Sequence, residues 1–72
     1  MIMSGSKAAV IQHIQMLDIH GTRLYDIVYL HEGESHPRQA RIGLESVYPN
    51  PQVGDRISVS YLMNVATGMT KA

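Results

Sequence analysis

A chain of 72 residues has room for one domain, and a domain of that size buries only about 60% of the surface that its unfolded chain exposes. The absence of cysteine excludes disulfides and thiolate zinc sites, so self-association is the expected reinforcement of a modest core. Six basic residues balance six acidic ones when the four histidines are neutral, which argues against a dedicated binder of duplex DNA or RNA.

The N-terminal residues 1–7 have neither the charged start and apolar stretch nor the cleavage site of a secretory signal, and they read as a flexible leader. The apolar runs elsewhere span only a few residues, too few for a helix that crosses a membrane. We therefore expect a cytoplasmic protein with no membrane partner.

Two runs rich in β-branched residues, 8–19 and 22–32, predict a pair of strands. Between them stands His20-Gly21, two residues that tolerate the positive φ angles of a type I′ hairpin turn. Counting outward from this turn places Asp18 opposite Arg23 as a pair of opposite charges, and it places apolar residues opposite one another. The predicted apolar pairs are Leu17 with Leu24, Met16 with Tyr25, Ile14 with Ile27, and Ile11 with Leu30.

This register divides the apolar side chains of the hairpin between two faces. One face carries Val10, Ile14, Met16, Tyr25, Ile27 and Tyr29. The other carries Ile11, Leu17, Ile19, Leu24, Val28 and Leu30, interrupted by His13, Gln15 and Asp26. Since both faces are partly apolar, we expect the second face to be partly covered, either because the hairpin curls into a small barrel or because it packs on a partner.

The rest of the chain predicts two further strands joined by polar connections. Residues 31–37 form a loop, 38–44 alternate as a third strand, and 45–48 either extend that strand or form one helical turn. Two prolines mark a connection that leads through a turn into a fourth strand over 56–65. Its alternation of Ile57, Val59, Tyr61, Met63 and Val65 with polar residues predicts one buried and one wet face, and 66–72 read as a flexible tail.

We therefore expect one mainly β domain over residues 8–65, an antiparallel meander of about four to five strands in a strongly bent sheet or a partly open barrel. Residues 53–62, Val-Gly-Asp-Arg-Ile-Ser-Val-Ser-Tyr-Leu, resemble the strand entry of small barrels of the OB and SH3-like types. The resemblance covers only this segment and implies architecture alone, so no functional residue is carried over from it.

One loop carries ligand types that suit a divalent transition metal. His31 and His36 stand with Glu32 and Glu34 within six positions. Their spacing matches no standard metal motif, so a solvated loop is the preferred interpretation and metal binding at His31 and His36 is a third hypothesis. We expect no resident cofactor.

A second group of residues could bind single-stranded nucleic acid. Tyr25, Tyr29 and Arg23 share one face of the second strand, where unpaired bases could stack on the rings. Three more arginines could contact phosphates: Arg38, Arg41 and Arg56. The balanced charge of the chain favours the alternative in which the tyrosines pack in the core with their hydroxyls at its edge.

The leading hypothesis is a noncatalytic binding or assembly module that joins itself, as a homodimer, or another protein. The contact would use a sheet edge or the face of Leu24 and Val28, where His13 and Asp26 add polar groups to an apolar patch. An enzyme is not expected, because the sequence has neither a nucleophile elbow nor a glycine-rich phosphate loop, and a small domain has little room for a deep pocket.

Overall fold

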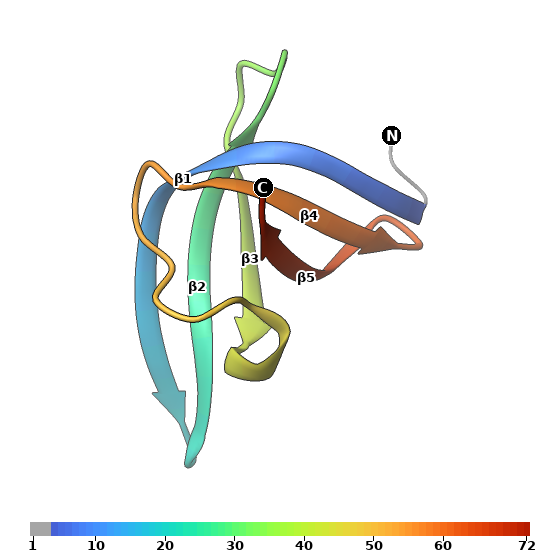
Figure 1. Cartoon of the computed structure of the whole chain (residues 1–72). Coiled ribbons are helices and arrows are strands. Elements are labelled where there is room, and N and C mark those ends of the chain that lie inside the picture. The colour runs from blue at the N-terminus through green and yellow to red at the C-terminus, as the bar shows by residue number, and fades with distance from the viewer. Residues whose placement is uncertain (1–3) are drawn as a thin grey trace.

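Five β-strands and one short helical turn make up the computed structural model, which describes residues 4–72 (Figure 1). The elements in chain order are β1 (Ser4–Ile19), β2 (Thr22–His31), β3 (Arg38–Gly43), the 3-10 turn η1 (Leu44–Ser46), β4 (Arg56–Leu62) and β5 (Val65–Lys71). The strands form one antiparallel sheet that is not closed, so the predicted mainly β fold with a bent sheet is confirmed. No helix in residues 4–72 is long and apolar enough to cross a membrane.

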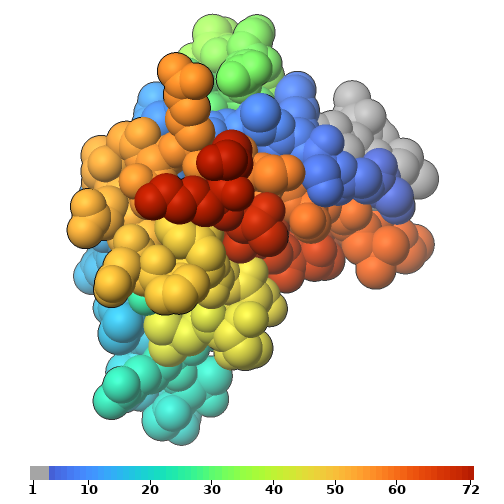
Figure 2. Space-filling view, in the orientation of Figure 1, coloured from blue at the N-terminus to red at the C-terminus, as the bar shows by residue number. Residues whose placement is uncertain are grey.

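The β1–β2 hairpin has the predicted turn. His20 and Gly21 adopt φ angles of 51° and 82°, both in the left-handed region that a type I′ turn requires. The predicted register is correct from the turn as far as the pair of Ile14 and Ile27. In the space-filling view the tip of this hairpin projects from the body of the molecule at the bottom (Figure 2).

Asp18 and Arg23 lie opposite each other, as predicted, but they form no ion pair in the described part of the chain. Asp18 Oδ1 instead accepts a hydrogen bond of 3.0 Å from the backbone N–H of Gly21. The carboxylate therefore stabilises the turn and does not bridge the strands, as short acidic side chains commonly do beside tight turns.

A β-bulge at Gln12 makes the predicted pairing of Ile11 with Leu30 wrong. The register of β1 shifts at this residue, so that Ile11 lies opposite Tyr29. One extra residue reverses which side chains face the core from this point toward the N-terminus. Ile11 is consequently buried in the core with Ile27 and Tyr29, whereas Val10, predicted to share their face, is only half-buried.

β1 lies between β2 and β4 in the sheet. It pairs with β2 over residues 9–19 and with β4 over residues 4–10, so the bulge at Gln12 lies beside the stretch that is paired on both sides, and the strand order is β3-β2-β1-β4-β5. The sheet curls until a parallel bridge between Val47 and Met69 joins the segment after η1 to β5 (Figure 1). The five strands therefore form a bent, unclosed antiparallel sheet, as the sequence predicts.

A second hairpin corrects both the predicted fourth strand and the predicted tail. Met63 and Asn64 adopt φ angles of 50° and 67° and form a two-residue turn, so 56–65 do not run as one strand. The chain then returns as β5, which pairs with β4 and leaves Met69 only 2% exposed. The small residues of this segment form a strand because β4 supplies an edge, and ladder hydrogen bonds depend on the backbone.

The predicted leader is also wrong over part of its length. Residues 1–3 lie outside the described residues, but Ser4 begins β1 and pairs with Leu62 of β4. The sheet therefore extends beyond 8–65 at both ends. The open question over 45–48 is settled as a single 3-10 turn, Leu44–Ser46.

The core fills the inside of the curled sheet. It draws on all five strands and on the segment after η1: Ala9, Ile11, Ile27, Tyr29, Ile42, Val47, Ile57, Val59, Tyr61 and Met69. His31, 1% exposed, is the polar side chain buried beside them in the described part of the chain. A buried imidazole needs hydrogen-bond partners, and those of His31 are the carbonyl oxygen of Ala8 and the hydroxyl of Tyr61.

Candidate functional site

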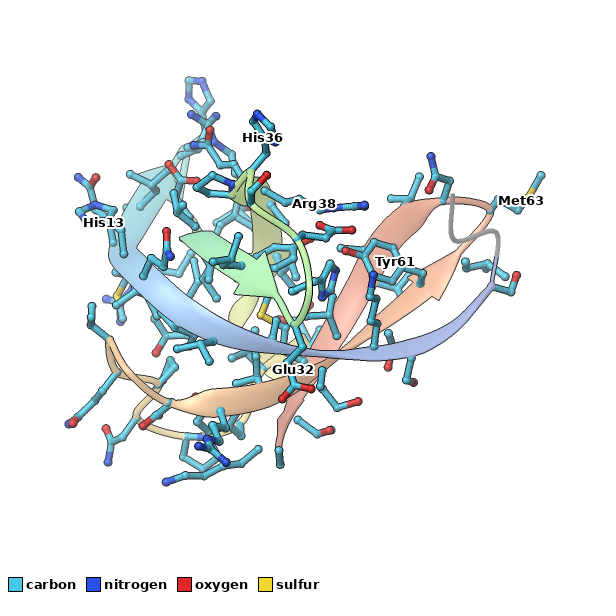
Figure 3. The ribbon with its side chains drawn as sticks, turned by 90° about the horizontal axis from the view of Figure 1, so that it is seen from above. His13, Glu32, His36, Arg38, Tyr61 and Met63 are labelled. Atoms are coloured by element: carbon cyan, nitrogen blue, oxygen red, sulfur yellow. The ribbon has the colours of Figure 1, made fainter. Side chains whose placement is uncertain are left out.

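A cleft of about 440 Å³ opens between β3 and β5, where the sheet does not close. Figure 3 shows Arg38 and Tyr61 directed toward each other in this part of the molecule. β3, β5, the β4–β5 turn and one residue each of β2 and β4 line the cleft: Tyr29, Arg38, Gln39, Ala40, Arg41, Tyr61, Asn64, Val65 and Ala66. The lining therefore contains two arginines and no acidic residue.

The backbone of β3 presents unpaired hydrogen-bonding groups to this cleft. The residues that flank a two-residue turn form a hydrogen-bonded pair, and such pairs alternate along an antiparallel ladder. Counting from the β1–β2 turn, Arg38, Ala40 and Ile42 direct their N–H and C=O groups toward β2. Gln39 and Arg41 direct theirs away from β2, to an edge where the described residues provide no partner strand.

The opposite wall of the cleft is a second sheet edge. Leu62 and Val65 flank the β4–β5 turn and form a hydrogen-bonded pair, so the next pair, Tyr61 with Ala66, is not hydrogen-bonded. The N–H and C=O groups of Ala66 therefore point away from β4 and toward β3. Ala66 lies opposite Tyr61 and Gly68 opposite Ser60, so one extra residue of β5 forms a bulge between these pairs. Beyond the bulge the N–H and C=O groups of Met69 also point away from β4, which agrees with the bridge between Met69 and Val47. The cleft is thus bordered by the free edges of two strands.

A chain of buried hydrogen bonds runs beneath the cleft. His31 Nδ1 lies 3.0 Å from the carbonyl oxygen of Ala8, which can only accept, so Nδ1 donates. In the neutral ring Nε2 then accepts from the Tyr61 hydroxyl at 2.6 Å, and Tyr61 in turn accepts from the Tyr29 hydroxyl at 2.9 Å. Burial, followed by the hydrogen bond to Tyr61, raises the pKa of Tyr29 well above its usual value.

Three charged side chains form a cluster at one side of the cleft. Glu34 accepts two hydrogen bonds from Arg38, of 3.1 and 2.9 Å, and one of 3.2 Å from Lys7. The Arg38 guanidinium also lies over the ring of Tyr61, 5.9 Å from its centroid. These contacts hold Arg38 at the mouth of the cleft and neutralise much of its charge.

Arg41 has no such partner. Its side chain makes no hydrogen bond or ion pair within residues 4–72. Asp26 lies directly across the ladder from Arg41, but Asp26 Oδ1 accepts a hydrogen bond of 2.8 Å from Gln39 Nε2. Arg41 therefore carries the exposed, available cation of the cleft lining.

The Glu34 cluster predicts a pH dependence of stability. The hydrogen bonds from Arg38, more than those from Lys7, hold the pKa of Glu34 below its ordinary value of 4.5. A carboxylate with a lowered folded-state pKa stabilises the fold above its unfolded-state pKa, and this contribution is lost as the pH falls through the folded-state value. Thermal melts between pH 2 and pH 7 should therefore show a shallower loss of Tm below pH 4.5 for Glu34→Gln than for the native chain.

Glu32→Gln is the matched control, because Glu32 is exposed and makes no side-chain hydrogen bond in the described chain. It should keep the native pH dependence. If both variants change that dependence equally, the cluster has no specific role in acid stability.

The structure does not assemble the residues of the predicted metal site. Both ring nitrogens of His31 are engaged by Ala8 and Tyr61, and His36 is exposed and hydrogen-bonded to Ser35. No group of three or more potential ligands is found among the described residues. Metal binding at His31 would thus require the buried hydrogen-bond chain to break.

The structure does not bring the residues of the predicted nucleic-acid face together. Tyr29 is 2% exposed, so its ring is closed to stacking, and Tyr25 is half-buried against the core. Arg23 lies near the exposed hairpin tip and Arg56 begins β4, both outside the cleft lining, which contains the other two arginines, Arg38 and Arg41.

The residues of the predicted protein-binding face lie on the outer side of the sheet. Leu24 and Val28 are half-buried, Asp26 is bonded to Gln39, and His13 is exposed opposite Val28. Their burial comes from neighbouring side chains of the same sheet, since the described residues form no second layer over it. This outer face stays a prediction.

Tyr61 and Ala66 belong to the candidate site but were not singled out by the sequence. The alternation of β4 predicted a buried Tyr61, yet only the pairing of β1 with β4 brings its hydroxyl to His31. No signal in the sequence marks Ala66, because its contribution is a free backbone edge.

Comparisons with models of protein families, with curated proteins and with solved structures found no match for this chain.

Proposed function

We propose that this chain is a noncatalytic binding module that takes up an extended segment of another protein as an added strand on β3. The observation that carries the proposal is the free edge of β3, where Gln39 and Arg41 present unpaired backbone groups to an open cleft. Main-chain hydrogen bonds give such strand addition its affinity, and the side chains along the groove give it specificity.

The surroundings of this edge support the uptake of a strand. The bridge between Val47 and Met69 holds one end of the gap, while the end near Ala66 stays open. A long open edge is a liability for aggregation unless it has a partner or a blocking residue. Residues 38–43 contain no proline, and the adjoining cleft is lined on its inner side by the small side chains of Ala40 and Ala66.

A second copy of the chain is a less suitable occupant. Antiparallel pairing of two β3 edges with Gln39 opposite Arg41 would place the Arg41 side chains of both copies on one face as diagonal neighbours. Like charges this close across a ladder are destabilising. The charge of β3 thus favours a different protein over the homodimer, and sedimentation of the free chain tests this choice directly.

Replacement of Gln39 by proline should abolish strand addition. Proline removes the outward N–H at this position, and proline is tolerated on an edge strand where that N–H has no partner in the fold. The probe is a ten-residue peptide that alternates valine with glutamate, titrated into the ¹⁵N-labelled protein. The amide signals of Gln39, Arg41 and Ala66 should shift in the native chain, and Gln39→Pro should weaken binding at least about tenfold.

Gln39→Ala is the matched control, because it loses the same hydrogen bond to Asp26 but keeps the N–H. It should bind the peptide within about twofold of the native chain. Unchanged amide signals at the β3 edge would contradict the proposed function, and equal weakening by the two substitutions would place the binding in the side chain.

A second candidate function is binding of single-stranded nucleic acid. One observation favours it, namely a cleft lined by Arg38 and Arg41 without an acidic residue. Labelled single- and double-stranded oligonucleotides, titrated at low and at physiological salt, test it by anisotropy. Phosphate contacts would give an affinity that falls steeply with salt and falls again in Arg41→Gln.

A further inference from the structure

We propose that the added strand is acidic, with a carboxylate side chain that binds Arg41 from the position facing it across the new ladder. This inference rests on the proposed function and adds the chemistry of the partner segment. Three features carry it: the charge of the cleft lining, the absence of a partner for Arg41, and the direction in which the Arg41 side chain points relative to its backbone.

Arg41 has no ion-pair partner near the cleft within residues 4–72. Glu34 is paired with Arg38 and Lys7, and Asp26 Oδ1 accepts its hydrogen bond from Gln39, so neither carboxylate binds Arg41. The guanidinium of Arg41 offers five N–H donors in a planar fork that matches a carboxylate, and none of them is used within residues 4–72. An incoming carboxylate would therefore find these donors free.

The register of β3 places this guanidinium beside a bound strand. Arg41 directs its backbone groups into the cleft and its side chain to the outer face of the sheet, together with Gln39. A ligand residue paired with Arg41 has its side chain on that same face, with Cβ atoms about 5 Å apart. A carboxylate at that ligand position is within reach of the Arg41 guanidinium.

The inner face of the cleft selects a different kind of side chain. Ala40 and Ala66 are small and pack against the core, and the ring of Tyr61 lies beside them in the lining. Ligand side chains that point inward would contact these apolar groups and not water. Because side chains alternate along a strand, the segment that fits has an acidic residue opposite Arg41 and apolar residues at the inward positions on either side of it.

The test uses three ten-residue peptides that alternate valine with glutamate, glutamine or lysine, each titrated into the full chain and followed by the amide signals of Gln39, Arg41 and Ala66. The glutamate peptide should bind most tightly and the lysine peptide least. Arg41→Gln should weaken binding of the glutamate peptide about fivefold, as expected for a partly exposed ion pair. It should leave the affinity for the glutamine peptide within about twofold.

Arg23→Gln is the matched control, because it removes the same charge from the exposed hairpin tip, away from the cleft. It should bind all three peptides as the native chain does. Equal affinities for glutamate, glutamine and lysine peptides that still shift the β3 amides would overturn the acidic ligand and leave strand addition intact. If no peptide shifts those amides, strand addition itself fails. If a single-stranded oligonucleotide displaces the glutamate peptide, or if sedimentation shows a β3-dependent dimer, the choice of a protein segment from another chain is wrong.

Discussion

Tyr61→Phe should destabilise the protein by about 2–4 kcal/mol, a large part of the stability of a domain this small. The substitution removes one hydroxyl, but that hydroxyl serves two buried partners, His31 Nε2 and the hydroxyl of Tyr29. Both partners would remain buried without a hydrogen bond, since Tyr29 is 2% exposed and His31 is 1% exposed. Urea unfolding followed by circular dichroism measures the change in the free energy of unfolding.

Tyr25→Phe is the control for this substitution. Tyr25 is also partly buried against the core, but its hydroxyl makes no hydrogen bond within residues 4–72. Its loss should change the free energy of unfolding by no more than about 0.5 kcal/mol. If Tyr61→Phe and Tyr25→Phe change the free energy of unfolding equally, the hydrogen bonds between Tyr29, Tyr61 and His31 add nothing to stability beyond the packing of the Tyr61 ring.

The same hydrogen-bond chain connects the core to the candidate site. Arg38 lies over the ring of Tyr61, and Tyr29 and Tyr61 both line the cleft. A Tyr61 ring that is held by His31 offers a fixed inner wall to a bound strand. Tyr61→Phe should therefore be compared with native protein for peptide binding as well as for stability.

Local signals were enough to predict the first hairpin. His20-Gly21 is a two-residue turn of a known type, and the turn sets the register on both sides without help from the rest of the fold. The alternation over 56–65 likewise predicted a strand with one buried face, which is correct as far as Leu62, where Ile57, Val59 and Tyr61 are buried.

The remaining features depend on strand pairings that the sequence does not encode locally. The bulge at Gln12 lies beside the stretch of β1 that pairs with both β2 and β4, and β5 forms because β4 has a free edge. The Met63–Asn64 turn escaped prediction because methionine is an unusual residue for positive φ.

The candidate site was only partly predictable for the same reason. Arg38 and Arg41 were singled out as cations, and the structure brings them to one cleft, but the cleft itself is created by β5. The tyrosines were grouped correctly on one face, and that face proved to be the core. Tyr29 is a core residue whose hydroxyl joins the buried hydrogen-bond chain, and Tyr25 packs against the core.

The bulge makes a second large prediction. Ile11→Ala should destabilise the protein by about 3–4 kcal/mol, whereas Val10→Ala should cost about 1 kcal/mol. Ile11 is 1% exposed and packs opposite Tyr29, while Val10 is half-buried on the outer face opposite Leu30. A strand without the bulge reverses this order, because the alternation from Ile14 would then direct Val10 into the core and Ile11 outward.

The comparison of these two substitutions is therefore a direct test of the register of β1. A total stability of about 4–11 kcal/mol is typical for a chain of this length, so Ile11→Ala could leave too little folded protein for a denaturation curve. Ile11→Val removes a single methylene-sized group and should cost about 0.5–1.5 kcal/mol, still more than the same truncation at an outward position. If Val10→Ala proves the more damaging substitution, β1 is not bulged, and the pairing with β4 that brings Tyr61 to His31 cannot have the register described here.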